Sequence, residues 1–310
     1  MSKLLSIVIP AYNEESNVGL IHNEIEKIMS VENINYEIIF VDDGSKDKTW
    51  NSILEQSQLN KNIKGIKFSR NFGKESAIFA GLNSAKGDCC AVIDSDLQHP
   101  PETLIKMYRL WEEGYDVIEG IKLSRGKENK IYKSFSKLFY KLMSASTKID
   151  MEKTSDFKLL DRKAIDAIIA LPEKNMFFRA MSAWVGFRTT TVGYEVQERA
   201  TGESKWSTIG LFKYAITNIV SFTTAPLHLV TILGILFLIF TIILGIQSIF
   251  NYIRGQALGG FTTVILIQLI TGSIIMLSLG IIGMYISAIY DEVKDRNRYI
   301  IETSINLKDK

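Results

Sequence analysis

The chain is poor in cysteine and histidine. Among its 310 residues there are two cysteines, and these are the neighbours Cys89 and Cys90. Consecutive residues of a strand point to opposite faces of a sheet, so we expect no disulfide between them and no disulfide framework. This composition is typical of a reducing compartment. His22, His99 and His228 are far apart in sequence and give no indication of a histidine metal site.

An excess of one charge sign is also missing. The formal net charge of +2 gives no indication of nucleic-acid binding, so nucleic acid is not expected as a partner. Charge is instead absent locally, because residues 214–253 and 256–290 contain no Asp, Glu, Lys or Arg. Since the first two-thirds of the chain carries both signs, the sequence divides into a water-soluble part and a lipid-soluble part.

The amino terminus has no secretory signal. The apolar run that starts at Leu4 ends at Pro10, and the polar residues Asn13 and Glu14 follow almost at once. A run this short is typical of a strand and not of a signal peptide. We therefore expect the N-terminal domain to remain in the cytosol.

Apolar strands and helices alternate through the first part of the chain. Strands are predicted at residues 4–9, 36–41, 63–68 and 89–93, and helices at residues 18–30, 49–58 and 74–85. Continuous apolar strands joined by helices indicate an α/β fold with a mostly parallel, Rossmann-like sheet covered on both faces. Ligands of such sheets bind beyond the carboxyl ends of the strands. Residues 10–12, 42–44 and 94–96 follow three of these strands and are expected to converge on one site.

Asp94 and Asp96 are the central candidates for chemistry. Two carboxylates at alternate positions after a strand can share one hard divalent cation, such as Mg²⁺ or Mn²⁺, which prefers oxygen ligands. Gln98 follows two residues later and can add an amide oxygen. An Asp-x-Asp pair alone is common, so its weight comes from its position after a buried strand and from the motifs that accompany it.

Four segments together resemble the family 2 glycosyltransferases, which have the GT-A fold. They are Ser6–Glu14 (SIVIPAYNE), Val41–Ser45 (VDDGS), Arg70–Lys74 (RNFGK) and Asp94–Glu102 (DSDLQHPPE). The nearest resemblance is to the branch of dolichyl-phosphate mannose synthase and bactoprenol glucosyltransferase. It covers nearly the whole chain, because that branch also ends in two membrane helices.

This resemblance implies a set of donor-site residues. The residues implied for nucleotide binding are Pro10, Tyr12, Glu14, Asp42, Asp43, Arg70 and Asp94. The residues implied for the metal and the diphosphate are Asp94, Asp96 and Gln98. Two alternatives stay open: Pro10 only ends a strand, and Asp42 and Asp43 only form an Asx turn with Gly44.

Two later segments resemble the acceptor side of the same branch. Asp156 matches an acidic residue near the acceptor and, with Asp96, is the candidate catalytic residue, either as a base or as an orienting group. A phosphate monoester has a second pKa of about 6, so the acceptor needs little help in losing a proton. In the alternative interpretation Asp156 only caps the structure that follows it.

A basic loop precedes the apolar part of the chain. Arg199 and Lys205, within Glu198–Trp206, are candidates for binding the acceptor phosphate or the diphosphate, and Arg179 is a further one. Alternatively the loop serves only to set the orientation in the membrane.

Several segments indicate contact with a lipid bilayer. Leu229–Phe250 has 22 uncharged residues, or about 33 Å as a helix, which is enough to span a membrane. Residues 262–288 form the second predicted span. Residues 129–148 have the pattern of a basic amphipathic helix, which either lies on the membrane or packs on the domain, and residues 209–227 are predicted to be an interfacial linker. The flanking cations predict that both ends are cytoplasmic, in an inner or plasma membrane.

These observations predict the organisation and activity of the protein. The expected parts are a cytosolic domain (1–208), a linker (209–227), a transmembrane hairpin (228–290) and a cytosolic tail (291–310). The reaction that the resemblance implies is inverting transfer of a sugar from a nucleotide-sugar to polyprenyl (undecaprenyl) phosphate, with UDP-glucose as first choice and UDP-GlcNAc or GDP-mannose as alternatives. A polysaccharide synthase is disfavoured because a Gln-x-x-Arg-Trp motif is missing, and the third hypothesis is an inactive membrane scaffold. Glycines in the spans permit a homo-oligomer.

Overall fold

A computed structural model describes residues 3–123, 154–173, 177–196, 216–217, 219–220, 223–255 and 260–307. The chain divides into two compact units, described separately below: a sheet unit of Met1–Ser207 and Arg296–Lys310, and a helical unit of Thr208–Asp295. The predicted amphipathic helix at 129–148 and most of the predicted linker at 209–227 lie outside the described residues.

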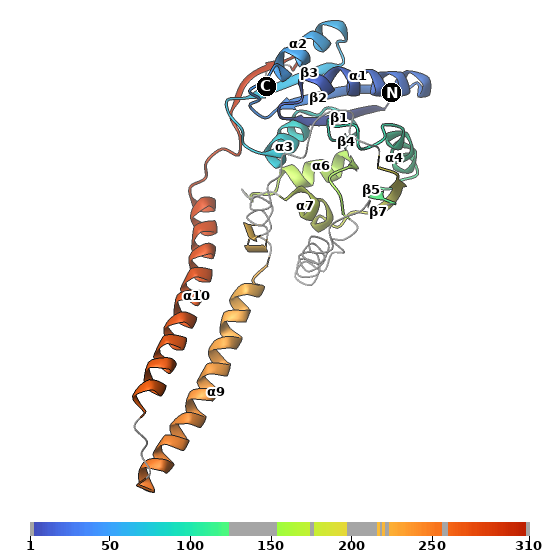
Figure 1. The fold of residues 1–310 in the computed structure, drawn as a ribbon. Helices are drawn as coiled ribbons and strands as arrows, with labels where there is room; N and C mark the ends of the chain where they lie inside the picture. Colours follow the sequence, from blue (N-terminus) through green and yellow to red (C-terminus); the bar gives the residue numbers. More distant parts are fainter. Residues whose placement is uncertain are drawn as a thin grey trace. The chain divides into compact units, whose positions relative to one another are not determined.

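A sheet of eight strands forms the centre of the sheet unit, in the order β7-β5-β6-β4-β1-β2-β3-β8 (Figure 1). The strands are β1 (Leu4–Ala11), β2 (Asn35–Asp42), β3 (Ile63–Phe68), β4 (Cys89–Val92), β5 (Val117–Lys122), β6 (Lys158–Asp161), β7 (Thr189–Tyr194) and β8 (Ile301–Ile305). The helices of this unit are α1 (Glu15–Glu32), α2 (Thr49–Leu59), α3 (Lys74–Ser84), α4 (Glu102–Glu112), α6 (Arg162–Ile169) and α7 (Phe178–Trp184). Strands β4, β1, β2 and β3 are parallel, so the predicted α/β fold with a mostly parallel sheet is confirmed.

Helices cover both faces of the sheet because its central strands are apolar on both sides. Leu5, Ile7 and Ile9 of β1 are fully buried in one cluster with side chains of α1, α2 and α4. Val8 points to the other face, where α3 packs so closely that a Cβ at Gly81 would lie 2.3 Å from Val8 Cγ1. Figure 1 shows α1 and α2 on one side of the strands and α3 and α6 on the other.

Strand β6 reverses the direction of the sheet next to β4. It is antiparallel to β4 and pairs Lys158 with Val92, the last residue of β4. The residues just before β6 therefore lie beyond the carboxyl end of β4. This register brings Asp156 to the same edge of the sheet as Asp94, although 61 other residues separate them in the sequence.

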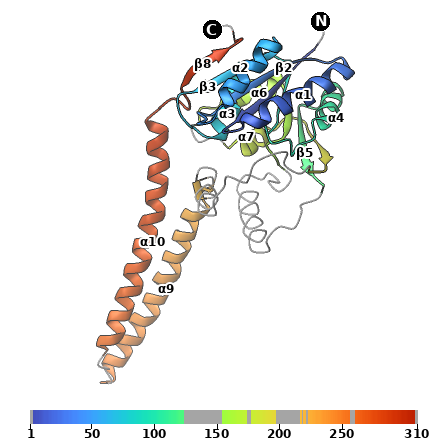
Figure 2. The same cartoon turned by 45° about the horizontal axis from the view of Figure 1, so that its top comes forward.

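The end of the chain returns to the sheet. Strand β8 pairs antiparallel with β3, matching Ile305 with Gly65 and Thr303 with Lys67 (Figure 2). Residues 291–310 were expected to form a cytosolic tail, and this strand within them was not predicted. Its pairing places the last part of the chain beside the segment that leads to α3.

The helical unit contains two long apolar helices, α9 (Ala225–Ile253) and α10 (Phe261–Val293). Both are long and apolar enough to cross a membrane, and the spanning windows contain no buried side chains. Tyr285 of α10 donates a hydrogen bond of 2.6 Å to the carbonyl of Thr223, just ahead of α9. The prediction of two apolar C-terminal helices is confirmed, and their orientation in a membrane stays a prediction.

Candidate active site

The loops that follow β1 and β2 are joined by hydrogen bonds at the carboxyl edge of the sheet. The backbone N–H of Asp43 donates to the Ala11 carbonyl at 2.9 Å, and that of Asn13 donates to Ser45 Oγ at 2.9 Å. On the other side of β1, the N–H of Ile93, the residue just after β4, donates to the Val8 carbonyl at 3.1 Å. The polar residues after β1, β2 and β4 thus leave the sheet side by side, as the strand pattern predicts.

Asp42 and Asp43 are both buried but have different partners. Asp42 Oδ1 accepts a hydrogen bond of 2.9 Å from Ser45 N–H, which is the Asx turn considered above. Its other oxygen, Oδ2, is buried without a hydrogen-bond partner among the described residues. Burial raises the pKa of the Asp42 carboxyl. A buried acceptor without a donor is costly, so this oxygen is suited to a ligand N–H or O–H.

Asp43 instead fixes the loop that precedes α3. Its carboxylate accepts hydrogen bonds from the backbone N–H of Phe72 at 2.7 Å and from that of Gly73 at 2.9 Å. Burial raises the pKa of Asp43 to about 6, against the lowering effect of these two donors. Gly73 has a φ of +97°, which favours glycine, and it precedes Lys74, the first residue of α3.

The other residues expected at the donor site lie around these loops. Pro10 is buried near the end of β1, and Tyr12 is half-buried just after it. Glu14 Oε2 accepts a hydrogen bond of 2.6 Å from Asn17 Nδ2. Arg70 is exposed, and its guanidinium lies 4.6 Å from the centre of the Phe72 ring.

Asp94 and Asp96 are half-buried in the loop after β4. Asp96 Oδ1 accepts a hydrogen bond of 3.1 Å from Gln98 N–H, across Leu97 in the left-handed conformation at φ 59°. Within the part of the chain that the structure describes, no group of three or more His, Cys, Asp or Glu side chains could hold a metal ion. Two carboxylates nevertheless suit Mg²⁺ or Mn²⁺ when phosphate oxygens of a substrate supply further ligands, so the residues fit a metal shared with a diphosphate.

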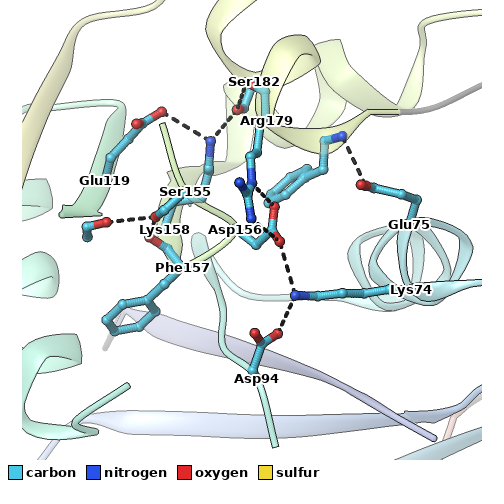
Figure 3. A network of polar contacts seen from close by, with 12 residues as sticks. Lys74, Glu75, Asp94, Glu119, Ser155, Asp156, Phe157, Lys158, Arg179 and Ser182 are labelled. Atoms are coloured by element: carbon cyan, nitrogen blue, oxygen red, sulfur yellow. Dashed lines mark hydrogen bonds and ion pairs between the residues drawn. The ribbon is translucent and has the colours of Figure 1, made fainter. Parts of the chain in front are cut away.

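Asp94 and Asp156 meet at the ammonium group of Lys74 (Figure 3). Lys74 Nζ lies 2.6 Å from Asp94 Oδ1 and 3.0 Å from Asp156 Oδ2. Arg179 contacts the same Asp156 from α7, with Nε 2.7 Å from Oδ1 and Nη2 2.9 Å from Oδ2. Residues from α3, α7 and the ends of β4 and β6 therefore form one ion-pair group.

The charges in this group control the protonation of its carboxylates. Burial alone would raise the pKa of Asp156, but the neighbouring Arg179 and Lys74 outweigh it and hold that pKa well below the ordinary value. The pKa of Asp94 is likewise lowered by Lys74 against the effect of burial. Both side chains are carboxylates at neutral pH, so Asp156 is a weak base and a strong acceptor for cationic donors.

A second ion pair, which is buried, supports the backbone of Arg179 through Ser182. Lys158 is fully buried, and its Nζ lies 3.1 Å from Glu119 Oε1 and 2.5 Å from Ser182 Oγ. Ser182 in turn donates to the Arg179 carbonyl at 3.1 Å. These contacts join β5, β6 and α7, as Figure 3 shows. This pair is not evident from the sequence, because a lysine inside a strand gives no signal of burial.

His99 lies beside the acidic loop in an aromatic setting. Its buried ring stacks on Phe157 with the ring centres 4.8 Å apart and meets Tyr194 edge-on at 5.4 Å. Burial lowers the pKa of His99, so the ring is neutral at pH 7. Its Nδ1 is buried without a hydrogen-bond partner among the described residues. Because Phe157 follows Asp156, this stack helps to fix the loop that carries Asp156.

The structure thus brings some of the predicted residues together and leaves others out. Asp94, Asp156 and Arg179 belong to one ion-pair group, whereas Arg199 and Lys205 lie outside the described residues. Lys74 belongs to the RNFGK segment, where the sequence leaves a purely structural role open for it, and it is not among the predicted site residues. A lysine at the start of a helix is usually exposed, so only its place opposite two carboxylates reveals its importance.

Comparison with known proteins identifies the family. The model of "Glycosyl transferase family 2" matches residues 6–169. An uncharacterized glycosyltransferase, YkcC, of Bacillus subtilis is 40% identical over 98% of this chain and 95% of its own length. A prophage-derived bactoprenol glucosyl transferase of Shigella flexneri is 33% identical over 97% and 98% of the two chains.

A solved structure shows the same fold. It is glucosyl-3-phosphoglycerate synthase from Mycobacterium tuberculosis, in complex with Mn²⁺, uridine-diphosphate and glucosyl-3-phosphoglycerate. It superposes with a TM-score of 0.54 at 18% identity, covering 70% of this chain and 78% of the other. The sheet, the acidic loop after β4 and the matched sequence agree: this chain is a glycosyltransferase with the GT-A fold and belongs to glycosyl transferase family 2.

Proposed function

We propose that the protein transfers a sugar from a nucleotide-sugar to polyprenyl phosphate at the cytoplasmic face of a membrane, with UDP-glucose as the donor. The observation that carries this proposal is that Asp94, on the donor side, and Asp156, on the acceptor side, contact the same ammonium of Lys74. The Shigella flexneri relative, named as a bactoprenol glucosyl transferase, supports the same reaction class.

The donor nucleotide binds in the loops after β1 and β2. Asp42 Oδ2, the buried acceptor without a partner, takes an N–H of the nucleobase. Pro10, Tyr12 and Glu14 line the base and the ribose. Asp43 acts by holding the Phe72–Gly73 backbone.

Arg70 lies in the loop between β3 and α3, just before Phe72, and is exposed, so that it can reach the nucleotide. Asp94, Asp96 and Gln98 would hold a divalent cation, Mg²⁺ or Mn²⁺, together with the diphosphate. When bound, such a cation stabilises the negative charge that develops on the leaving diphosphate.

The acceptor phosphate binds on the side of Asp156. Arg179, Arg199 and Lys205 attract it, and Asp156 fixes the direction of the Arg179 guanidinium. A phosphate oxygen then attacks the anomeric carbon as the bond from that carbon to the diphosphate breaks, and the nucleoside diphosphate leaves. One displacement inverts the configuration, so an α-linked donor gives a β-linked lipid. Since the attacking phosphate is already an anion at neutral pH, orientation contributes more than proton removal.

The membrane keeps donor and acceptor at one surface. A polyprenyl chain leaves the bilayer at a cost of about 0.8 kcal/mol for each exposed CH₂, so the enzyme meets it at the head-group layer. Helices α9 and α10 form a transmembrane hairpin in an inner or plasma membrane, with the sheet unit and both termini in the cytoplasm. The sugar lipid then serves the modification of a cell-surface glycan.

A transfer assay tests this proposal. Purified full-length protein is incubated with undecaprenyl phosphate, Mg²⁺ and labelled UDP-glucose, UDP-GlcNAc or GDP-mannose. We expect organic-extractable label from UDP-glucose above the other two donors, and none without undecaprenyl phosphate. Label in a polymer would indicate a polysaccharide synthase. Binding of nucleotide without transfer from any of the donors would indicate an inactive scaffold.

A further inference from the structure

Lys74 is the described residue that joins the two halves of the ion-pair group. Its ammonium contacts Asp94 at 2.6 Å and Asp156 at 3.0 Å, and its side chain is about one-third exposed. Asp156 has a second cationic partner, because Arg179 contacts both of its carboxylate oxygens. Asp94 depends on Lys74 for the ion pair described at its Oδ1.

The backbone at Lys74 is fixed from both sides. Gly73, before it, donates its N–H to Asp43 at 2.9 Å, and Glu75, after it, accepts the N–H of Phe178 at 3.0 Å. The second contact ties the start of α3 to α7, the helix that carries Arg179 (Figure 3). The movable part is therefore the lysine side chain, a flexible four-carbon stem with a compact charge.

A divalent cation and this ammonium compete for one carboxylate. Asp94 is the first residue of the metal-binding pair proposed above, and the short contact with Lys74 occupies its Oδ1. A cation bound to Asp94 and Asp96 would lie close to the Lys74 ammonium, and like charges at such distances repel strongly in a partly buried site. Asp156 offers the ammonium a second partner to which it can move without leaving the group.

We propose that Lys74 is a positioning residue that holds Asp94 and Asp156 together before metal binds and releases Asp94 to the arriving divalent cation. The role rests on the sugar transfer proposed above, because it assigns the metal to the donor side of that reaction. The released ammonium stays on Asp156, beside Arg179. Its charge is then no longer shared with Asp94, so it can attract the acceptor phosphate only when the cation occupies Asp94 and Asp96. Metal occupancy on the donor side is thereby coupled to acceptor binding.

Direct measurement of Mn²⁺ binding tests the competition without reference to activity. Full-length wild-type protein and Lys74→Met are titrated with Mn²⁺ in the absence of nucleotide, with free Mn²⁺ followed by electron paramagnetic resonance. Because a competing charge contact is removed, Lys74→Met should bind Mn²⁺ roughly 3- to 30-fold more tightly. Lys74→Arg, which keeps a cation at this position, should bind Mn²⁺ as weakly as the wild type.

The matched control is Lys163→Met, which removes an exposed lysine from its ion pair with Asp116 (2.8 Å) outside this group. Its Mn²⁺ affinity should equal that of the wild type. If Lys74→Met does not fold, amine labelling of the wild-type protein replaces it: Lys74 should react faster with an amine-selective reagent when Mn²⁺ is added. Equal or weaker Mn²⁺ binding by a folded Lys74→Met, or unchanged labelling, would overturn the proposal.

The outcomes separate this inference from the proposed function. Tighter Mn²⁺ binding by Lys74→Met, together with no sugar transfer by the wild type from any donor, would support the inference and refute the lipid-glycosylation reaction. Sugar transfer by the wild type with unchanged Mn²⁺ affinity in Lys74→Met would refute the inference alone. An absence of Mn²⁺ binding in both proteins, even with uridine diphosphate present, would refute the inference together with the metal requirement.

Discussion

Arg179 contacts both carboxylate oxygens of Asp156, with its Nε 2.7 Å from Oδ1 and its Nη2 2.9 Å from Oδ2. A guanidinium makes such a paired contact through its planar fork, whereas an ammonium is a point charge. Lys158, Glu119 and Ser182 support this geometry from the buried side. The orientation of Asp156 therefore depends on arginine at position 179 and not on positive charge alone.

Replacement of Arg179 by lysine should lower kcat/KM for the lipid acceptor. Hydrogen bonds to charged groups contribute about 1.5–3 kcal/mol, so we expect a loss of roughly 10- to 150-fold in Arg179→Lys. The control is Arg109→Lys, at an exposed arginine that pairs with Glu112 and Glu32 on the surface. Full activity of a folded Arg179→Lys would show that the paired contact has no part in transfer.

The pH dependence of transfer should come from the acceptor and not from Asp156. Arg179 and Lys74 overcome the effect of burial and hold the pKa of Asp156 well below its ordinary value, so this group stays ionised from pH 5 to pH 9. The second ionisation of the phosphate, with a pKa of about 6, should then set the rise of activity with pH. We expect Asp156→Asn to lower kcat at every pH in this range while the midpoint of the rise stays the same.

This profile distinguishes an orienting group from a base. Single-turnover rates of the wild type and Asp156→Asn are measured between pH 5 and pH 9 at saturating donor. Disappearance of the rise in Asp156→Asn would identify Asp156 as the titrating base. The same ion pairs stabilise the fold above the ordinary pKa of an aspartate, and that contribution is lost as the pH falls towards the lowered pKa.

The end of the chain should support the donor site through its contacts with the segment before α3. The ring of Tyr299 stacks on Phe68 with the centres 5.0 Å apart, and the Ile300 carbonyl accepts the N–H of Ser69 at 3.1 Å. Tyr299→Ala removes the stack, which we expect to cost about 1–2 kcal/mol of unfolding free energy and to weaken binding of uridine diphosphate.

Thermal unfolding of the sheet unit and titration with uridine diphosphate measure these two effects. The control is Glu302→Ala, which removes the exposed ion pair of 2.9 Å between Glu302 of β8 and Lys67 of β3. Tyr299→Ala with the stability and nucleotide affinity of Glu302→Ala would show that the stack of Tyr299 on Phe68, just before β8, does not support the site.

The strands of the central sheet could be predicted because they are continuous apolar runs with local turn signals. Strand β3 was predicted with the bounds that the structure shows, Ile63–Phe68. Strand β8 could not, because its residues are mostly exposed and its partner lies more than 230 residues earlier in the chain. A short edge strand that pairs with a distant part of the chain has no alternation of apolar and polar residues by which it could be predicted.

In the candidate site, the residues at strand ends could be predicted from the sequence, whereas the contacts between them could not. Strand ends indicated that Asp42 and Asp94 belong to one edge of the sheet, because neighbouring parallel strands share that edge. The contact of Lys74 with both Asp94 and Asp156 depends on the antiparallel insertion of β6, which no local pattern shows. The burial of Lys158 was hidden for the same reason, since only tertiary packing supplies its partners Glu119 and Ser182.

Loss of the second acidic residue of the Asp-x-Asp pair should abolish metal-dependent transfer. In the wild type, Asp96 Oδ1 accepts the N–H of Gln98 at 3.1 Å. Asp96→Asn keeps an oxygen that can accept this hydrogen bond, so we expect the loop to remain folded. The loss of a metal-ligand charge should lower activity by at least ~10²-fold. A chelator should abolish wild-type transfer, and Mg²⁺ or Mn²⁺ should restore it. Full wild-type transfer in chelator would contradict the metal role of this pair.

The anomeric configuration of the lipid product tests the central claim most directly. Purified wild-type protein is supplied with UDP-glucose, in which the sugar is α-linked, together with undecaprenyl phosphate and Mg²⁺. The sugar phosphate is released from the extracted lipid and examined by NMR. A single displacement at the site of Asp94 and Asp156 predicts β-linked glucose phosphate from the lipid fraction. An α-linked product, or glucose released to water with no label in the lipid, would contradict the account.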